Sequence, residues 1–264
     1  MAPVPAPRAT HRPGHRSVAA AVVVLLLFWG SAVVKMGVSV GEDRRYWSQP
    51  RGEAGGLLYV ALGDSAAQGI GAGVPDRGYV GLLAQKLRAA TGRPVRVLNL
   101  SRSGARIDDL IATQLPRLQG LHPDLVTVAI GGNDVRAYDA STFARRVDTL
   151  TAALPAGTAI ADVPYFMHGH WESDAKQAAT AVRRSAEQRG LTVVRLHAAL
   201  QRQGWSAMLT HTAADWFHPN NRGYRVWAQA FWDALSASTT CQEPAQPAAS
   251  GCPALARIAA SAVR

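Results

Sequence analysis

The stretch LLYVAL at residues 57–62 leads directly into Gly63, Asp64 and Ser65. An unbroken run of apolar residues is typical of a parallel strand that is covered on both faces. The small and polar residues after it mark the carboxyl end of the strand, and the working groups of open parallel sheets gather beyond such ends. This stretch therefore predicts a buried strand that ends in a functional loop.

The same alternation of apolar runs and helical patterns continues along the chain. The other runs expected as strands are 95–100, 125–130, 158–163 and 192–196. The helical patterns are 79–90, 107–118, 142–154, 173–189 and 221–235. Strand followed by helix, five times over, implies right-handed crossovers and a three-layer α/β/α sandwich. The sequence thus predicts one α/β domain over residues 57–235 with a five-stranded parallel sheet.

Three more polar loops fall next to the expected elements. The polar block 99–104 comes at the end of the second strand, and residues 131–134 follow the third. The sequence DWFHP at residues 215–219 comes just before the last helix. Because the carboxyl ends of parallel strands meet at one edge of a sheet, we expect these loops to lie beside Ser65.

The residue types in these loops predict a serine nucleophile with an activating pair. A serine hydroxyl is a poor nucleophile until a base takes its proton, and His218 is the natural base for Ser65. Asp215, three residues before His218, can hold the imidazole in the tautomer that presents its other nitrogen to the serine. The Gly-x-Ser-x-Gly elbow of α/β-hydrolases is missing around Ser65, so that frame is not expected.

Attack on an ester places negative charge on the carbonyl oxygen, which needs fixed hydrogen-bond donors. We expect the backbone N–H groups of Ser65 and Gly104 to supply two donors, and the side-chain amide of Asn133 a third. A glycine at position 104 suits a backbone that approaches the substrate closely. These three residues are the expected oxyanion hole.

The four blocks, in this order, resemble the SGNH hydrolases, also called the GDSL esterase/lipase family. Ser65, Gly104, Asn133 and His218 fall on the four name-giving positions, and Asp215 falls on the Asp of the family's Asp-x-x-His. The resemblance covers residues 57–235. It implies a flavodoxin-like parallel sheet, no metal or other cofactor, and hydrolysis of carboxylic esters through an acyl-enzyme.

Several neighbouring residues are interpreted as structural. Asp64 and Asp134 are expected to brace their own loops through hydrogen bonds to the backbone. The sequence has Ala66 where the common family motif has Leu, and this departure bears on the fit of the substrate only. Four tryptophans are expected mostly to pack in the core or between helices: Trp205, Trp216, Trp227 and Trp232. His197 and His211 are assigned no role.

The loop after the fourth strand is expected to line the substrate site, with Phe166, Met167 and Trp171 as its pocket residues. His168 and His170 in this loop could suggest a metal pair. No carboxylate lies at ligand spacing, however, so a loop that lines the cleft is the preferred interpretation and no metal site is expected.

The amino-terminal end predicts a membrane-spanning or signal segment. Residues 1–17 are basic and Pro-rich, and residues 18–34 form an apolar run without a charge. We interpret residues 18–40 as a hydrophobic helix that serves as a transmembrane signal anchor, with a cleaved signal peptide as the alternative. The basic tail would stay in the cytoplasm and the catalytic domain would lie outside the cell. Residues 41–56 read as a polar linker.

Residues 236–264 form a carboxyl-terminal tail in which Cys241 and Cys252 bracket a Pro/Gly-rich loop. In an exported chain two such cysteines indicate a disulfide, and the alternative is two free thiols.

The formal net charge is +10, but the arginines are scattered, with no dense run or aromatic stripe. No nucleic-acid partner is expected, whereas an anionic membrane or cell-wall surface would suit the charge.

Three functions fit these observations. The first is an exported, membrane-tethered serine esterase that cleaves a lipid or acylated-sugar ester and acts as a monomer. The second is an acyltransferase that passes the acyl group to a carbohydrate. The third is a non-catalytic carbohydrate- or cell-wall-binding module, which has no need of an activated serine. The ester itself is not indicated by any motif.

Overall fold

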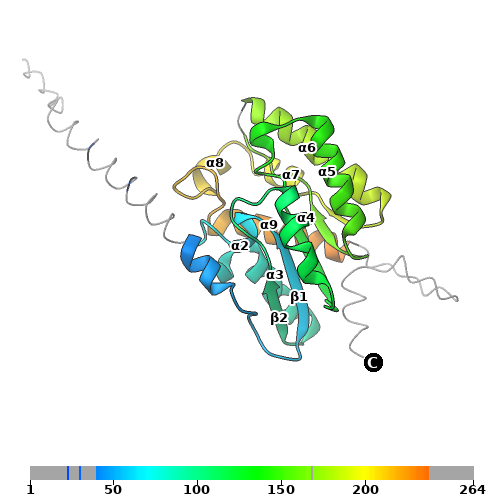
Figure 1. Cartoon of the computed structure of the whole chain (residues 1–264). Coiled ribbons are helices and arrows are strands. Elements are labelled where there is room, and N and C mark those ends of the chain that lie inside the picture. Colours follow the sequence, from blue (N-terminus) through cyan, green and yellow to red (C-terminus); the bar gives the residue numbers. More distant parts are fainter. Residues whose placement is uncertain (1–22, 24–29, 31–39, 168, 238–264) are drawn as a thin grey trace, which may run out of the picture.

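The computed structural model describes residues 23, 30, 40–167 and 169–237, and its centre is a five-stranded parallel sheet (Figure 1). The strands are β1 (Leu57–Gly63), β2 (Val95–Asn99), β3 (Leu125–Ala129), β4 (Ala159–Ala161) and β5 (Thr192–Val194). Their order is β2-β1-β3-β4-β5, which is the flavodoxin-like order of doubly wound sheets. The predicted parallel sheet of five strands is confirmed.

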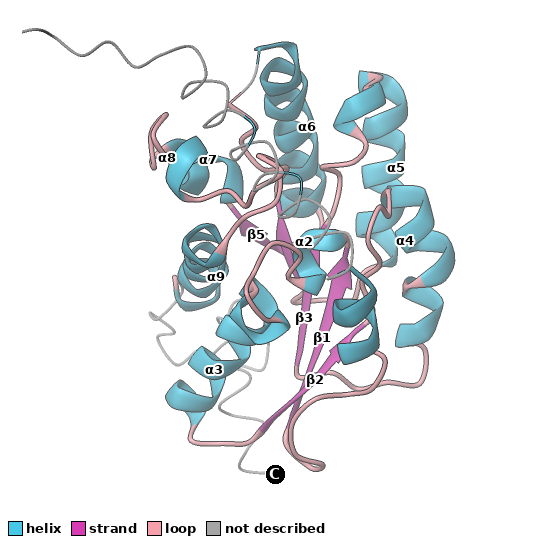
Figure 2. Cartoon of the chain, turned by 90° about the vertical axis from the view of Figure 1, so that its left-hand side faces the viewer, coloured by secondary structure: helices cyan, strands magenta, loops and turns pink. Residues whose placement is uncertain are grey.

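Helices cover both faces of this sheet (Figure 2). The α-helices are α2 (Ser65–Gln68), α3 (Tyr79–Thr91), α4 (Ile107–Thr113), α5 (Ala140–Ala153), α6 (Gly169–Gln188), α7 (Leu196–Gln201), α8 (Ala207–Thr210) and α9 (Asn221–Ser236). Three short 3-10 turns are η1 (Pro75–Arg77), η2 (Leu115–Leu118) and η3 (Val135–Ala137). One apolar layer joins the sheet to α3, α7 and α9, and a second joins it to α4, α5 and α6.

The central strand β1 shows why its sequence is apolar throughout. Tyr59 and Ala61 belong to the layer under α3 and α9, whereas Val60 and Leu62 belong to the layer under α4, α5 and α6. Successive side chains of a strand point to opposite faces, so a strand covered on both faces has no polar position. The continuous apolar runs were therefore a reliable signal for these strands.

Some element boundaries differ from those predicted. The run 192–196 is not one strand, because β5 ends at Val194 and Leu196 begins α7. The helix expected over 107–118 ends as α4 at Thr113, and η2 follows with Pro116 at its start. Proline lacks the N–H that would continue an α-helix, which accounts for the change of geometry there.

The stretch interpreted as a linker, 41–56, is partly built into the domain. Residues 40–46 are helical, and Trp47 is buried with its indole N–H donating to the Gln68 carbonyl at 2.9 Å. Arg51 then pairs with Val97 as an isolated antiparallel bridge on the outer side of β2. Such a bridge covers part of the edge of the sheet.

The predicted apolar helix of residues 18–40 lies outside the described residues, apart from Val23, Gly30 and residue 40. The tail with Cys241 and Cys252 lies outside them as well. Within the part of the chain that the structure describes, no helix has both the length and the apolar character needed to cross a bilayer.

The tryptophans interpreted as packing residues divide into two groups. Trp227 is buried, and Trp232 packs against the same core. Trp205 and Trp216, by contrast, are 80% and 48% exposed. The packing interpretation is wrong for these two, because both lie in the irregular segments around α8 and before α9, away from any helix face that meets the sheet.

A buried glutamine fixes the end of β1. The side chain of Gln114 accepts a hydrogen bond from the Gly63 N–H at 2.8 Å and donates one to the Gly63 carbonyl at 2.8 Å. Gly63 has a φ of 149°, and a Cβ there would lie 2.3 Å from the Ala129 carbonyl oxygen. The backbone at Gly63 thus approaches β3 too closely for any side chain, and Gln114 satisfies its two polar groups.

We expect Gln114→Ala to lower the free energy of unfolding by about 3 kcal/mol, because a buried N–H and a buried carbonyl lose their partner. Equilibrium unfolding in urea measures this loss. The exposed Gln119 provides the matched control, since Gln119→Ala should change the free energy by less than about 0.5 kcal/mol. Equal losses in the two variants would contradict the role of Gln114.

Candidate active site

The serine expected as nucleophile lies at the first turn after β1. Asp64 is the N-cap of α2, and its Oδ1 accepts a hydrogen bond from the Ala66 N–H at 2.9 Å. This cap turns the chain directly from β1 into α2, so Ser65 is the first residue of the helix and lines a cavity. Asp64 therefore braces the loop that presents the serine hydroxyl.

The other two residues of the predicted relay come from the loop before α9. His218 Nε2 lies 2.9 Å from Ser65 Oγ, and His218 Nδ1 lies 2.5 Å from Asp215 Oδ2. A carboxylate can only accept, so Nδ1 carries the proton and Nε2 is left to accept from the serine hydroxyl. The structure brings Ser65, His218 and Asp215 into one hydrogen-bonded series in the tautomer that base catalysis requires.

Asp215 is held in its charged form. Burial raises the pKa of Asp215. Hydrogen bonds from the His218 ring and from the backbone N–H groups of Phe217 and His218, together with the charge of His218, lower it by more than burial raises it. The net effect places the pKa of Asp215 below its ordinary value. The carboxylate can thus stay ionised while it orients the imidazole.

The loop that carries Asp215 and His218 is fixed by its own backbone. The Ala213 N–H donates to the His218 carbonyl at 2.8 Å, and Asn220 Nδ2 donates to the Thr212 carbonyl at 2.8 Å. Asn220 also caps α9 through its Oδ1. Trp216 adopts a φ of 56°, a conformation that few residues other than glycine adopt, so the turn is constrained at this point.

The three expected oxyanion donors differ in their hydrogen-bond partners and in their position relative to the cavity. The backbone N–H groups of Ser65 and Gly104 donate to no partner within the described residues. Asn133 Nδ2 donates one hydrogen to the Ala105 carbonyl at 3.0 Å, which orients the amide and leaves its second hydrogen unused. Ser65 and Asn133 line the cavity, whereas Gly104, with a φ of 78°, is exposed and is not part of the cavity wall.

Two buried polar residues, Gln68 and Asn99, join α2 to the loop at 101–104, and the sequence marked only Asn99, within the polar block 99–104. Gln68 Nε2 donates to the Ser101 carbonyl at 3.0 Å, and Gln68 Oε1 accepts from Ser103 Oγ at 2.6 Å. Asn99 Nδ2 donates to the Ala67 carbonyl at 2.7 Å. These contacts hold the Gly104 loop against the turn that carries Ser65. A buried glutamine in a helix has no sequence signature, so Gln68 could not be found from the pattern.

Asp134 bonds to a different segment, and it does not cap its own loop as the sequence had suggested. Its Oδ2 accepts from the Ile107 N–H at 3.3 Å, at the start of α4, and Arg146 Nη1 lies 3.9 Å from its Oδ1. Burial raises the pKa of Asp134, while the Ile107 N–H and Arg146 oppose that shift. The loop with Asn133 is thereby attached to α4.

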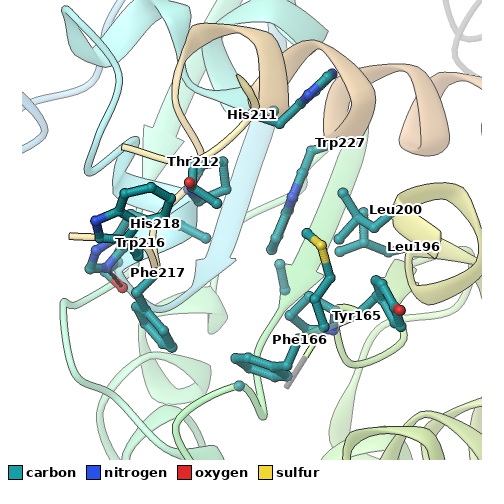
Figure 3. Close-up of a pocket in the computed structure, with 18 of the residues that line it drawn as sticks. Tyr165, Phe166, Leu196, Leu200, His211, Thr212, Trp216, Phe217, His218 and Trp227 are labelled. Carbon is teal, nitrogen blue, oxygen red and sulfur yellow. Dashed lines mark hydrogen bonds between the residues drawn. The ribbon is translucent and has the colours of Figure 1, made fainter. Parts of the chain in front are cut away.

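The cavity beside Ser65 has a volume of about 380 Å³ and a mostly apolar wall. Phe166, Met167 and Trp171, the expected pocket residues, all line it. The sequence did not indicate the part of the apolar wall that comes from α7, α8 and α9: Leu196, Leu200, Ala207, Met208 and Trp227. In Figure 3, Leu196 and Leu200 lie on the opposite side of the cavity from His218, so the cavity extends well beyond the reacting atoms.

His197, to which no role was assigned, is buried behind the cavity wall. Its Nδ1 lies 3.1 Å from the Val163 carbonyl, and its Nε2 lies 3.0 Å from Glu172 Oε1. Glu172 Oε2 in turn accepts from the Phe166 N–H at 2.9 Å. This chain of contacts fastens the loop with Phe166 to α6 and α7.

The structure describes one of the two histidines considered for a metal, His170. His168 lies outside the described residues, and His170 makes an edge contact with the ring of Trp171. Among the residues with described positions, no group of three or more His, Cys, Asp or Glu side chains could hold a metal ion.

A parallel sheet that presents a serine, a histidine and an aspartate in series at its carboxyl edge has the architecture of a hydrolase. The sequence comparison agrees with this class. The model of the GDSL-like Lipase/Acylhydrolase family matches residues 61–226, and the chain belongs to this family.

Individual relatives cover different shares of the chain. A lipase from Streptomyces rimosus is 38% identical over 89 residues, which are 32% of this chain and 33% of that lipase. The match thus spans about a third of this curated relative. Among solved structures, the α/β hydrolase LAE5 from the metagenome of Lake Arreo in Spain is 28% identical with a TM-score of 0.57, over 69% of this chain and 96% of that one.

Two other solved structures share the fold at lower identity. A variant of Axe2, an acetyl xylan esterase from Geobacillus stearothermophilus, is 23% identical with a TM-score of 0.56, over 67% of this chain and 94% of that one. TesA is 23% identical with a TM-score of 0.56, over 69% of this chain and 99% of that one.

The carboxyl group of Asp64 makes the stability of this site depend on pH. Burial raises the pKa of Asp64 from its ordinary 3.8 to about 6, against the opposing hydrogen bond from Ala66 and the charge of His218. Between these two values the folded protein keeps a proton that the unfolded chain has released. The contribution of Asp64 to stability therefore falls as the pH rises through this range.

We expect Asp64→Asn to remove this slope, because the amide oxygen can still accept the capping hydrogen bond but cannot ionise. The variant should gain on the order of 2 kcal/mol relative to the wild type between pH 4 and pH 7, as measured by urea unfolding. Asp43, whose pKa is also raised to about 6 by burial and by Glu42, leaves a residual slope.

Asp139 provides a control of opposite sign. Hydrogen bonds from Thr142 and Ser141 lower its pKa to about 2, so its contribution is lost only as the pH falls below about 4. Asp139→Asn should thus leave the slope above pH 4 unchanged. If Asp64→Asn kept the wild-type slope as well, the shifted pKa of Asp64 would be disproved.

Proposed function

We propose that this chain is a carboxylic-ester hydrolase with Ser65 as nucleophile, His218 as general base and Asp215 as the group that orients the histidine. The observation that carries the proposal is the hydrogen-bonded series from Ser65 Oγ through His218 to Asp215, which opens on an apolar cavity. Membership of the GDSL-like lipase/acylhydrolase family supports it.

In the first half of the reaction, Ser65 Oγ bonds to the ester carbonyl carbon while its proton passes to His218 Nε2. The carbonyl oxygen becomes an oxyanion, and the free N–H of Ser65 and the unused amide hydrogen of Asn133 are the donors proposed for it. His218 then gives its proton to the alcohol oxygen, the carbon–oxygen bond of the ester breaks, and the alcohol leaves. The product is an acyl group bound to Ser65.

In the second half, His218 takes a proton from a water molecule whose oxygen attacks the acyl carbon. The bond to Ser65 Oγ breaks as the serine recovers its proton from His218, and the carboxylic acid is released. Asp215 stabilises the imidazolium that forms in both halves without itself taking up the proton. Gly104 is proposed as the third oxyanion donor, since its N–H has no partner among the described residues and its loop is tied to α2.

The cavity favours an ester that carries an alkyl chain. Its wall is formed mostly by aliphatic and aromatic side chains, including Leu196, Leu200 and Trp227. A sugar ring needs several polar partners, whereas an alkyl chain gains free energy with each methylene that leaves water. We therefore place the apolar part of the substrate in this cavity, with Phe166, Met167 and Trp171 in its wall.

We also propose that the enzyme is exported and membrane-tethered. The uncharged apolar run of residues 18–34 after a basic tail supports this location, because such a run with positive residues on its amino-terminal side inserts with that side in the cytoplasm. The domain that follows would then act outside the cell.

We expect Ser65→Ala to lower kcat for p-nitrophenyl esters by about 10⁴-fold or more, because the nucleophile is lost. Asn133→Ala should lower kcat by about 10² to 10³, the usual cost of one oxyanion donor. Release of p-nitrophenolate measures both. Ser48→Ala, a serine outside the cavity wall, is the control and should match the wild type. Equal rates for wild type and Ser65→Ala would refute the proposed mechanism.

The cavity generates a separate expectation about chain length. Each buried methylene contributes about 0.8 kcal/mol, so kcat/KM should rise about fourfold per methylene from acetate toward octanoate until the cavity is filled. Leu200→Trp fills space opposite His218 and should lower the octanoate-to-acetate ratio of kcat/KM at least about tenfold. Leu118→Trp, in η2 and away from the cavity, should keep the wild-type ratio. A flat wild-type profile would exclude an alkyl site.

A further inference from the structure

The segment between α7 and α9 has apolar residues on two opposite sides. Its inner side chains, including Ala207 and Met208 of α8, line the cavity beside Ser65. Its outer side chains include Trp205 and Leu209, which are 80% and 57% exposed. Figure 1 shows α8 at the outer margin of the described domain. The segment separates the cavity from solvent by a single layer of chain.

Large exposed apolar side chains are unusual on so short a segment. Single apolar residues scattered over a surface are ordinary, but neighbouring ones next to a binding cavity indicate an interaction site. Trp216, 48% exposed, belongs to the cavity wall itself. Exposed apolar side chains therefore occur both on the segment that carries α8 and in the cavity wall.

A basic groove adjoins this apolar surface. Arg202, Arg222 and Arg225 line it together with Gln203 and His211, which also line the cavity. The three arginines are exposed, and none lies within 4.0 Å of a carboxylate among the described residues. The groove contains one acidic residue, Asp233. Its positive charge is thus not neutralised by ion pairs in the fold.

We infer that Trp205 and Leu209, with Arg202, Arg222 and Arg225 beside them, form a docking surface for an anionic lipid surface. The two apolar side chains enter the interface between headgroups and acyl chains, and the arginines bind the headgroup charges. An alkyl ester can then pass from the lipid layer into the cavity beneath α8. This inference rests on the proposed esterase function and names the partner that presents its substrate.

Three observations favour a lipid surface as the occupant. Tryptophan is the side chain enriched at membrane interfaces, where its ring is half in the apolar and half in the polar layer. Apolar residues flanked by arginines are typical of segments that lie in the plane of an anionic membrane. The segment that carries Trp205 and Leu209 also contributes Ala207 and Met208 to the wall of a cavity that fits an alkyl chain.

The test compares one enzyme on two forms of substrate. The full chain hydrolyses p-nitrophenyl acetate in solution and p-nitrophenyl palmitate incorporated in vesicles of phosphatidylglycerol and phosphatidylcholine, or of phosphatidylcholine alone. Trp205→Ser with Leu209→Ser should lower the rate on vesicles about tenfold and leave acetate hydrolysis within about twofold. Trp205→Phe should retain the vesicle rate, because it keeps an apolar ring.

Charge reversal tests the groove separately. Arg202→Glu with Arg225→Glu should lower the rate on anionic vesicles about tenfold or more and abolish their advantage over neutral vesicles, as high salt should do for the wild type. Arg88→Glu with Arg117→Glu makes the same change in net charge. These residues lie in the last turn of α3 and in η2, at the edge of the sheet opposite to the cavity, and their reversal should have little effect.

The outcomes separate this inference from the proposed function. If the wild type cleaves neither ester, the esterase proposal fails. If it cleaves both and the docking variants keep the wild-type vesicle rate, the docking surface is refuted while the esterase stands. A vesicle rate that is unchanged together with a lower oligomeric state of the Trp205→Ser, Leu209→Ser variant would assign the surface to a second copy of the chain and overturn the lipid inference.

Discussion

The hydrogen bond between Ser65 and His218 joins residues that are 153 positions apart in the sequence, and the rest of the site depends on it. It forms only if α9 is held firmly against the turn after β1. The Tyr224 hydroxyl donates to the Ile70 carbonyl at 2.6 Å, and the ring of Phe231 stacks on Tyr79 with centroids 4.8 Å apart. These contacts are buried in the apolar layer between α3, α9 and the sheet. The packing of that layer therefore sets the distance between the serine and the histidine, and shifts of about 1 Å in such distances have large effects on rate.

The other side of the site is held by different means. The backbone at Gly63 lies so close to β3 that no side chain fits there, and the adjoining loops are fixed by hydrogen bonds from Gln114, Gln68 and Asn99. In a dry interior each polar group left without a partner costs about 1–3 kcal/mol. Such a network is stable only when all of its members are paired. Apolar packing thus positions the base, while a buried polar network positions the nucleophile.

The sequence predicts the sheet well because its strands are buried on both faces, and a short, continuous apolar run between helical patterns fits little else than a covered strand. The sequence also predicts that Ser65, Asp215 and His218 lie together, because topology fixes the edge at which the parallel strands end. It does not predict α7. The run 192–196 contains Thr192 and Arg195 among its apolar residues, and α7 begins at its last residue. There the His197 N–H donates to the carboxylate of Asp162, 35 residues away, at 2.7 Å. A cap supplied by tertiary structure leaves no local signal. The part of the cavity wall formed by α7 and α8 likewise depends on tertiary contacts, so the sequence did not predict it. The same holds for the exposure of Trp205.

Asp64 connects the stability of the fold to the proposed chemistry. Burial raises the pKa of this carboxyl to about 6, and the charge of His218 is among the effects that lower it. Such a coupling is reciprocal, so a charge on Asp64 must favour the protonated form of His218 by the same free energy. In the proposed reaction the histidine becomes positive as Ser65 loses its proton. The imidazolium is then stabilised by Asp215 through a hydrogen bond and by Asp64 through the field alone. Asp64 is ionised above about pH 6 and can then supply this charge. Burial of the Asp64 carboxylate is unfavourable in the resting protein, but its charge stabilises the transition state in the proposed reaction. Its role as the N-cap of α2 holds Asp64 in this position.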